Sequence, residues 1–388
     1  MIGGQESLAE HFNAALRSGV LHMAAHSHHP WPDVTREAHL RAWDVAARDL
    51  DGKWAGVLGT ELPQARRHVA GRLGLSDADE IAFAQNTHEL LVRICSVLPM
   101  PMRVLTTDAE FHSATRQLDR WTEAGLALVE RVPAEPLRTF PERFVDAMGP
   151  EHDLILFSHV FYGSGYAVPD VAQIVSAVPD ERTFVVVDGY HAFMALPTSI
   201  TPIQDRAFYL AGGYKYAMAG EGACFVNAPP GYAQRPVNTG WFAAFDHLAD
   251  SPGTGSRAVP YARGGQRLAG STFDPSGLFR FNAVQRWLDD LGVGVAEIHG
   301  HVSGLQKRVL AGLAQQPGIL AGAELIPAAG CDRGHFLTYR TPAAGQIART
   351  LAERGVLVDH RADRLRLGLG VYHDEDDVDQ LLNALDRT

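Results

Sequence analysis

Residues 183–227 read TFVVVDGYHAFMALPTSITPIQDRAFYLAGGYKYAMAGEGACFVN, and this stretch decides the fold. An apolar run of strand length at 184–187 ends on the acid Asp188. A second apolar run, at 207–211, leads through two glycines to Lys215. A third run, at 223–226, follows a glycine-containing turn. The pattern predicts adjacent strands that bring an acid and a lysine to neighbouring ends of one sheet.

An acid and a lysine placed in this way suit pyridoxal phosphate chemistry. Asp188 would keep the pyridine nitrogen protonated, so that the ring can accept electrons, while Lys215 would bind the aldehyde and later act as a base. Each residue alone has a plainer interpretation: the acid could cap a helix and the lysine could be a surface side chain. The two residues together favour a cofactor site.

The sequences DGYHA at 188–192 and YKY at 214–216 carry a family resemblance. They resemble the fold-type I pyridoxal phosphate enzymes of the class V aminotransferase group, and kynureninase most of all. This resemblance implies an α/β fold with a large domain, whose mostly parallel sheet is flanked by helices, and a smaller α+β C-terminal domain. It also implies that His191 contacts the cofactor and that Tyr214 is a catalytic residue beside Lys215. We expect residues 1–60 to form an N-terminal arm and part of the small domain, 61–277 the large cofactor-binding domain, and 278–388 the C-terminal small domain.

The composition is that of an ordinary globular protein, and it narrows the choice of partners. Of 388 residues, 46% are hydrophobic and 20% are charged, and the net charge is −11. This charge argues against nucleic acid or an anionic membrane as the main partner, and no apolar run approaches the about 18 residues of a membrane span. The three cysteines lack CxxC spacing, which predicts neither a disulfide framework nor a zinc site and fits a cytoplasmic location. We expect no metal at the histidine-rich segment 26–29.

A strand-to-helix turn in the first third of the chain is a candidate phosphate site. An apolar strand at 80–84 is followed by Gln-Asn-Thr and by a helical pattern over 88–98. Backbone N–H groups at a helix start bind phosphate, so Asn86 and Thr87 are predicted to hold the cofactor's phosphate. The plainer interpretation is that Thr87 only caps the helix. After the next strand the resemblance places an aromatic ring on the cofactor's face, with Phe111 as the better match and His112 as its rival.

Strand and helix patterns alternate through the first half of the chain, which predicts a parallel sheet flanked by helices. The C-terminal part reads as helices and short strands, with Thr341 capping one helix and Asp374 capping the last. The segment 250–260 is rich in Gly, Ser and Pro and predicts a mobile loop. Strands are expected at 80–84, 103–106, 126–130, 154–158, 184–187, 207–211, 223–226 and 356–358, and helices at 8–16, from 33 through 43, 88–98, 113–124, 279–292 and 342–354.

The resemblance assigns further site residues. Trp241 would lie by the cofactor's phosphate and the substrate. Ser271 and Thr272 are both candidates for a hydroxyl that reaches the phosphate of the other subunit, which implies a homodimer with shared active sites. Arg366 would grip the α-carboxylate of an amino-acid substrate through a two-pronged contact. The loop that would face the substrate contains His26, Ser27 and His28, although the same segment also reads as an ordered Pro-rich turn.

The resemblance predicts a reaction as well as a fold. A kynureninase-like enzyme would hydrolyse the Cβ–Cγ bond of L-kynurenine, 3-hydroxykynurenine or a related aryl-ketone amino acid, to give alanine and an anthranilate. A class V aminotransferase, a racemase and a C–S β-lyase use the same shared residues, so these alternatives stay open. A cysteine desulfurase would need a nucleophilic cysteine near 359–363, where there is none, and Cys331 comes too early in the chain.

Overall fold

The computed structural model describes residues 8–13, 19–247 and 258–386. Its centre is a seven-stranded sheet with the strand order β2-β8-β7-β6-β5-β3-β4. The strands from β7 to β4 run parallel to one another, and β8 runs antiparallel to both of its neighbours. The predicted mostly parallel sheet is therefore confirmed. The strands are β2 Ile81–Ala84, β3 Met102–Thr107, β4 Ala127–Val132, β5 Leu154–Ser158, β6 Phe184–Asp188, β7 Phe208–Gly212 and β8 Cys224–Asn227.

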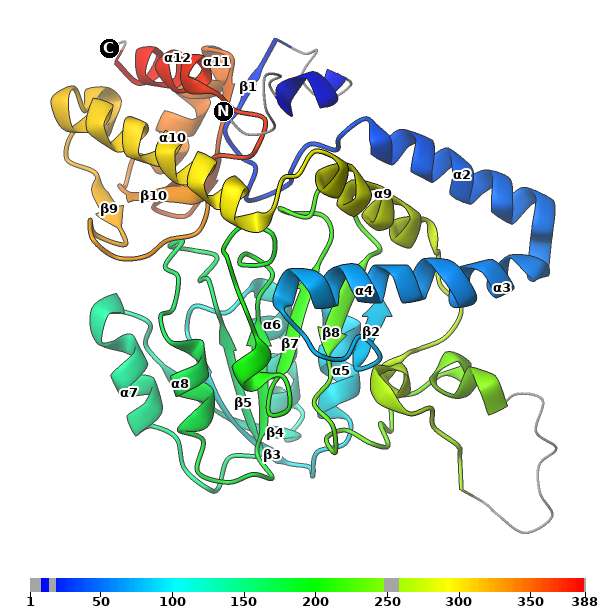
Figure 1. Ribbon diagram of the computed structural model, residues 1–388. Coiled ribbons are helices and arrows are strands. Elements are labelled where there is room, and N and C mark those ends of the chain that lie inside the picture. The colour runs from blue at the N-terminus through cyan, green and yellow to red at the C-terminus, as the bar shows by residue number, and fades with distance from the viewer. Residues whose placement is uncertain (1–7, 14–18, 248–257, 387–388) are drawn as a thin grey trace.

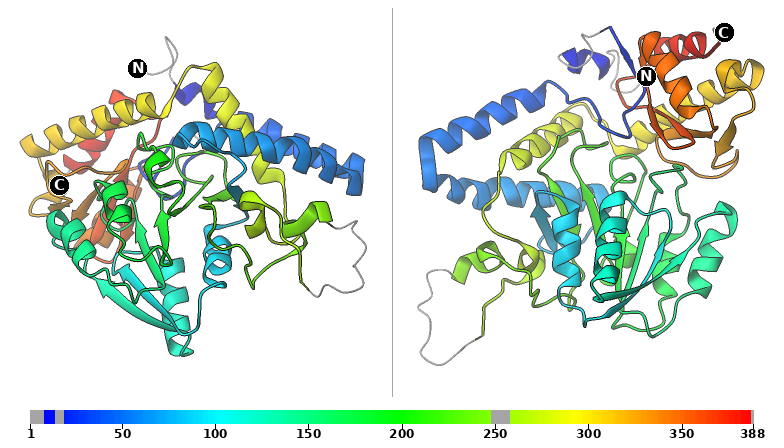
Figure 2. Two further views of the ribbon diagram at one scale, coloured as in Figure 1. Left: turned by 60° about the horizontal axis from the view of Figure 1, so that its bottom comes forward. Right: turned by 180° about the vertical axis from the view of Figure 1, so that it is seen from behind.

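Helices cover both faces of this sheet because its strands are apolar on both sides. Along β6, Phe184 and Val186 belong to one hydrophobic core, while Val185 and Val187 belong to the other. Helices α5 and α6 pack on the first core and lie in front of the sheet when the molecule is seen from behind (Figure 2). Helices α7 and α8 lie on the opposite face (Figure 1). These helices are α5 Thr87–Cys95, α6 His112–Glu123, α7 Phe140–Asp146 and α8 Val171–Ser176.

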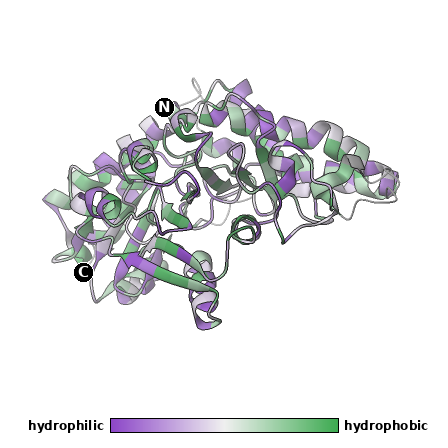
Figure 3. Ribbon diagram, turned by 90° about the horizontal axis from the view of Figure 1, so that it is seen from below, coloured by the Kyte–Doolittle hydropathy of each residue, from purple (hydrophilic) through white to green (hydrophobic). Residues whose placement is uncertain are grey.

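A helical layer links the large sheet to the rest of the chain. Helix α9 contacts both α2 and α4, and its buried side chains join the second core. Hydrophobic and hydrophilic stretches alternate along the peripheral helices, as expected when one face of a helix packs inward (Figure 3). The helices of this layer are α2 Val34–Asp49, α3 Lys53–Gly56, α4 Leu62–Leu73 and α9 Ser276–Asp290.

A second, antiparallel sheet lies in the C-terminal part, with the order β12-β13-β10-β9. The N-terminal strand β1 returns to this part of the molecule and pairs in parallel with β11. Met23 accordingly packs in the same hydrophobic core as the C-terminal helices. The elements are β1 Leu21–His22, α10 Val295–Gln315, β9 Glu324–Ile326, β10 Phe336–Arg340, α11 Ala344–Glu353, β11 Val356–Leu357, β12 Asp359–Arg361, β13 Arg364–Gly368 and α12 Glu375–Asp386. The domain boundaries at 60/61 and 277/278 stay predictions.

Some local expectations are corrected. The N-terminal segment forms a short 3-10 helix, Leu8–His11. Residues 14–16 of the expected 8–16 helix lie outside the described residues, as does most of the expected 250–260 loop. Thr341 was expected to cap α11, but the cap position is Ala343. Asp374 does cap α12, because its Oδ1 accepts a hydrogen bond from the N–H of Asp377 at 3.0 Å.

Candidate active site

The predicted acid and lysine lie at neighbouring strand ends. Asp188 is the last residue of β6, and Lys215 follows the end of β7 by three residues. The two strands are parallel neighbours, with Asp188 opposite Leu210. Because parallel strands end at the same edge of a sheet, their carboxyl ends gather side chains there. The apolar runs at 184–187 and 207–211 therefore correctly predicted that these two residues lie at neighbouring strand ends.

A cavity of about 390 Å³ opens at this edge of the sheet. It receives side chains from the ends of β2, β5, β6 and β7 and from the start of α5. Seven of the predicted site residues line it together: Asn86, Thr87, Phe111, Asp188, His191, Tyr214 and Lys215. Ten other residues line the cavity, and among them Ser158, Tyr162, Tyr190, Glu221 and Cys224 were not singled out as site residues from the sequence.

The surroundings of Lys215 favour its uncharged amine, which is the form that can act as a base. Its side chain is buried, and its Nζ lies 2.6 Å from Nε2 of His191. Burial lowers the pKa of Lys215 to about 7, with Asp188 opposing the shift and Arg366 adding to it. Burial also lowers the pKa of His191, so that its ring is neutral and can accept a hydrogen bond from the amine. An uncharged amine is thus accessible at neutral pH.

Asp188 is positioned by the turn that follows it. Its Oδ1 accepts a hydrogen bond from the N–H of Tyr190 at 2.9 Å. Burial raises the pKa of Asp188, while this hydrogen bond and the charge of Lys215 lower it. Gly189 is needed in the turn because a Cβ there would lie 2.0 Å from the ring of Tyr209. A protonated ring nitrogen is the kind of partner that would stabilise this buried carboxylate.

The start of helix α5 lines one end of the cavity, and this end is suited to bind an anion. Asn86 is the N-cap residue: its Oδ1 accepts a hydrogen bond from the N–H of Glu89 at 2.9 Å. The interpretation of Thr87 as the cap is therefore wrong, and Thr87 is instead the first residue of the helix. Both residues line the cavity at the positive end of the helix dipole, which favours a phosphate.

Phe111, and not its rival His112, forms the aromatic wall of the cavity. The Phe111 ring centroid lies 5.4 Å from Nζ of Lys215, and the ring packs edge-on against Tyr162 with a centroid distance of 5.4 Å. His112 is exposed, and its Nε2 lies 3.4 Å from the hydroxyl of Tyr162. Acid, lysine, helix N-terminus and flat ring thus converge on one cavity, and this set of residues fits pyridoxal phosphate.

Arg366 comes from the second sheet and lies beside the cavity without lining it. It is the central residue of β13, it is buried, and its Nη1 donates a hydrogen bond to the carbonyl oxygen of Tyr162 at 2.5 Å. Its Nη2 pairs with the carboxylate of Asp359. The Nε of Arg366 has no hydrogen-bond partner among the described residues. A buried guanidinium with an unused N–H group is suited to bind a further carboxylate.

The predicted substrate loop is divided between two places. His26 is fully buried, stacks on Phe336 with a centroid distance of 4.6 Å, and has Nε2 at 3.5 Å from Oδ2 of Asp359. Burial lowers the pKa of His26 to about 3. His28 is exposed and stacks on Tyr214 with a centroid distance of 5.3 Å, and Ser27 lies between them, half-buried. The roles of these three residues toward a substrate stay predictions.

Trp241, Ser271 and Thr272 lie outside the lysine cavity of their own chain. Nε1 of Trp241 donates a hydrogen bond to Oγ1 of Thr272 at 3.2 Å. Ser271 and Thr272 line a separate cavity of about 290 Å³, which shares Gln85 with the lysine cavity. Their predicted contact with a cofactor phosphate would therefore have to be made in a second subunit.

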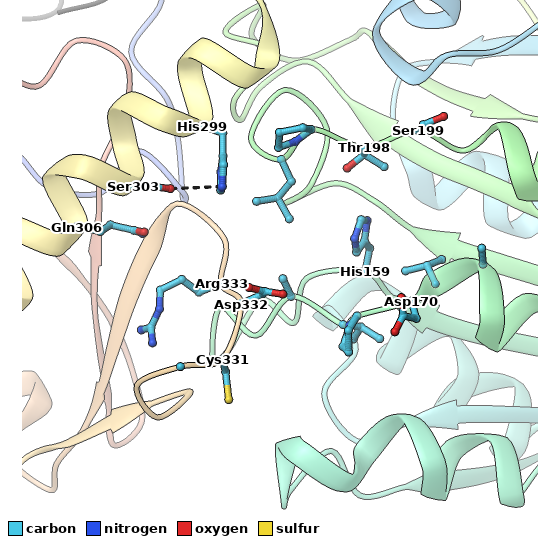
Figure 4. A pocket seen from close by; sticks show the side chains of 18 of the residues that line it. His159, Asp170, Thr198, Ser199, His299, Ser303, Gln306, Cys331, Asp332 and Arg333 are labelled. Atoms are coloured by element: carbon cyan, nitrogen blue, oxygen red, sulfur yellow. Dashed lines mark hydrogen bonds between the residues drawn. The ribbon is translucent and has the colours of Figure 1, made fainter.

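A nucleophilic thiol is not found beside Lys215 in the described part of the chain. Cys224 lines the cavity, but it is buried 3.3 Å from the hydroxyl of Tyr190, and burial raises the pKa of its thiol to about 11. Cys331 lines a different cavity of about 710 Å³, where it lies across from His159 with its sulfur directed away (Figure 4). Among the described residues the cysteines form no disulfide, and there is no group of three or more His, Cys, Asp or Glu side chains that could hold a metal.

Comparison with known families agrees with this geometry. The model of the aminotransferase class-V family matches residues 46–381. The chain belongs to this family. The predicted fold class is therefore confirmed, and so is pyridoxal phosphate as the cofactor. No helix in the described parts is long and apolar enough to cross a membrane.

Individual relatives point to reactions other than kynurenine hydrolysis. Isopenicillin N epimerase from Streptomyces clavuligerus is 28% identical over 356 residues, which cover 83% of each chain. The cysteine desulfurase CsdA of Escherichia coli is 23% identical over 92% of this chain and 90% of its own. The structure of the cystine C–S lyase C-DES superposes with a TM-score of 0.82 at 17% identity, over 96% of this chain and 98% of that one, which shows the shared fold. None of these three is a kynureninase, so the finer part of the resemblance is not supported.

Proposed function

We propose that this class V enzyme uses pyridoxal phosphate to move the α-proton of an amino acid, and that it epimerises or racemises its substrate. The observation that carries the proposal is the buried Lys215, whose amine has a pKa lowered to about 7 in a cavity that also holds Asp188. The similarity to isopenicillin N epimerase over 83% of both chains supports this reaction over the others.

The cavity residues would have two roles in this reaction, holding the cofactor and moving the α-proton. The cofactor, when bound, supplies an electron sink for the carbon that loses its proton. Asp188 and His191 would hold its ring, and Asn86 and Thr87 would hold its phosphate. Lys215 removes the proton from Cα, because its amine is uncharged at neutral pH. A proton delivered to the opposite face of Cα would invert the configuration; water would supply this proton, and Lys215 would release its own to the solvent.

Arg366 would recognise the substrate by binding its α-carboxylate. Its unused Nε faces no partner among the described residues, while Asp359 and the Tyr162 carbonyl hold its two Nη atoms. An α-carboxylate bound there would orient the Cα–H bond toward Lys215. His26, Ser27 and His28 would contact the rest of the substrate, and Tyr214, stacked on His28, would shape the same wall.

A C–S β-lyase is the second candidate, and one observation favours it. Elimination needs the same proton abstraction but no protein thiol, and the described part of the cavity offers no reactive thiol. The fold of the cystine C–S lyase C-DES matches at a TM-score of 0.82. A desulfurase of the cysteine-nucleophile type is disfavoured for the same reason. Hydrolysis of L-kynurenine or 3-hydroxykynurenine rests on the sequence motifs alone, among them those that contain His191, Tyr214 and Trp241.

The proposal includes a second subunit. In one chain, Ser271 and Thr272 line a neighbouring cavity and Trp241 bonds to Thr272, and a homodimer with shared active sites would let these side chains reach the partner's cofactor. We also propose that the enzyme acts in the reducing cytoplasm, which fits the three cysteines that form no disulfide among the described residues.

The test follows three products in one panel. Purified, cofactor-loaded protein is incubated in deuterated water with amino acids of both configurations, with L-cystine and with L-kynurenine. Exchange of the α-proton and chiral chromatography report epimerisation, pyruvate and ammonia report elimination, and anthranilate reports hydrolysis. Lys215→Ala is the blank, and Lys307→Ala, which changes an exposed lysine on α10, is the matched control.

We expect deuterium at Cα together with the opposite enantiomer, both lost in Lys215→Ala and kept in Lys307→Ala. Pyruvate from cystine without inversion would move the assignment to the lyase. Anthranilate as the main product would restore the kynureninase hypothesis. Absence of α-proton exchange with every amino acid, despite bound cofactor, would refute the proposal.

A further inference from the structure

Glu110 is a buried acid next to the cofactor cavity that the steps above leave unused. It lies between β3 and α6, directly before Phe111, and only 3% of its surface is exposed. A charged side chain is rarely buried to this extent unless its oxygens are bonded. Its contacts therefore indicate what holds it there.

The carboxylate of Glu110 bonds to two neighbouring strand ends. Its Oε1 accepts hydrogen bonds from Oγ1 of Thr107, at the end of β3, at 2.7 Å and from the N–H of Ser158 at 3.1 Å. Its Oε2 accepts a hydrogen bond from Oγ of Ser158 at 2.6 Å. Ser158 ends β5, lines the cofactor cavity and lies opposite Asp188 in the sheet. One side chain thus joins the loop that carries Phe111 to the strand end beside the catalytic acid.

We propose that Glu110 is a positioning residue of the cofactor site, which fixes Phe111 and Ser158 against the cofactor and whose proton sets the polarity of the Ser158 hydroxyl. The inference rests on the proposed function, since it assigns a role toward the same cofactor. An ionised carboxylate only accepts hydrogen bonds, so the Ser158 hydroxyl must donate to it and offers only lone pairs to the cavity. A protonated Glu110 donates to Ser158 Oγ instead, and the Ser158 hydroxyl then donates into the cavity.

Both states of Glu110 are accessible at neutral pH. Burial raises the pKa of Glu110 to about 7, the hydrogen bonds from Ser158 and Thr107 oppose the shift, and the negative charge of Asp188 adds to it. Asp188, on β6, is the charged group that faces Glu110 across β5, and Thr107 and Ser158 are its uncharged neighbours on β3 and β5. A change in the charge of Asp188 on cofactor binding would therefore also change the protonation of Glu110.

The test compares Glu110→Gln with Glu123→Gln, which removes the same charge at the exposed end of α6. Gln keeps the size of the side chain and can donate from its amide to Ser158 Oγ, so it imitates the protonated acid. The visible absorption of the bound cofactor is followed from pH 5 to 9, and the affinity of the apoprotein for pyridoxal phosphate is titrated at pH 8.

We expect Glu110→Gln to weaken cofactor affinity by about 3- to 10-fold, because the Ser158 hydroxyl loses the carboxylate to which it donates and the strand end is held less firmly. The midpoint of the pH-dependent change in cofactor absorbance should move by about half a pH unit or more, because one negative charge has left the site. Ser158→Ala should change the spectrum in the same direction, and the double variant should add little, since the two residues act as one unit. Glu123→Gln should match the wild type.

Stability separates positioning from a structural role. An acid whose pKa is raised by burial lowers stability when it ionises, so the apoprotein of Glu110→Gln should be at least as stable as the wild type at pH 8. Unchanged affinity and pH profile in both Glu110→Gln and Ser158→Ala would overturn the inference while leaving the proposed function intact. A wild-type protein that takes up no pyridoxal phosphate would overturn the proposed function itself.

Discussion

Replacing Lys215 by Met should stabilise the apoprotein while it abolishes activity. The wild-type amine is buried, and its pKa falls from 10.5 to about 7. At pH 7 this lysine is therefore fully protonated in the unfolded chain but only about half protonated in the folded chain, and this difference destabilises the fold. Methionine has a similar length and flexibility and no charge, so it removes this cost while it fills most of the same space.

The magnitude follows from the pKa shift. One pKa unit corresponds to about 1.4 kcal/mol, so the full shift corresponds to roughly 5 kcal/mol. Because the folded lysine is about half protonated at pH 7, roughly 4 kcal/mol of this is the upper bound at that pH. Asp188 loses a favourable cation when Lys215 is removed, which offsets part of the gain. We therefore expect a net increase of about 2–3 kcal/mol in the free energy of unfolding at pH 7.

The pH dependence has a defined sign. A lysine with a lowered folded pKa destabilises the fold most below that pKa, and the cost disappears as the pH rises toward 10.5. Urea unfolding of the two apoproteins at pH 7 and pH 10, with Lys307→Met as the control, measures the difference. The reasoning is refuted if Lys215→Met is no more stable than the wild type at pH 7, or if its advantage is as large at pH 10.

Other predictions concern the ends of the cavity and the buried histidines. Arg366→Lys should lower kcat/KM by about 100-fold, because lysine lacks the planar guanidinium that can bond to Asp359, to the Tyr162 carbonyl and to a substrate carboxylate at once. Steady-state kinetics should show this loss while the cofactor spectrum stays unchanged, and a loss below about 5-fold would contradict the assignment. Asn86→Ala should cost about 1 kcal/mol of stability through the lost helix cap and weaken cofactor binding, which thermal unfolding and cofactor titration would report. Burial lowers the pKa of three histidines, His26, His29 and His373, to about 3, so the folded protein binds fewer protons than the unfolded chain at acid pH. The free energy of unfolding should therefore fall as the pH drops from 7 to 5, by up to about 2 kcal/mol for each histidine. A free energy of unfolding that does not change between these pH values, measured by chemical unfolding, would contradict this.

The sequence located the strands of the large sheet because these strands are apolar on both faces and end at turn residues. The expected run at 154–158 matches β5, the run at 184–187 is one residue shorter than β6, and the run at 223–226 is shifted by one residue from β8. Helix α10, by contrast, was not predicted, although it is 21 residues long. The apolar face of this helix packs against α12. It was hard to recognise in the sequence because glycines at 300, 304 and 312 and many polar residues interrupt the helical pattern.

Residues at the strand ends were predictable for the site because parallel strands deliver them to one edge. Contacts across the fold were not, since they join segments far apart in the chain. Glu110 bonds to Ser158, 48 residues away, and Arg366 bonds to the carbonyl of Tyr162, 204 residues away. Main-chain partners such as this carbonyl have no sequence signature. The sequence favoured kynurenine hydrolysis, whereas the relatives favour the alternative of a racemase or lyase, because the motif around Lys215 is shared across the whole family and does not separate these reactions.

The bond from Arg366 to the Tyr162 carbonyl has a consequence for selectivity. It joins the second sheet to the loop that follows β5, so the guanidinium is held in place before any ligand arrives. A preorganised anchor loses little entropy on binding. In the proposed reaction it would also set a fixed length between the substrate carboxylate and the carbon that Lys215 must reach. Amino acids whose carboxylate is one or two bonds farther from the amine would therefore be rejected by distance alone, whatever their side chain.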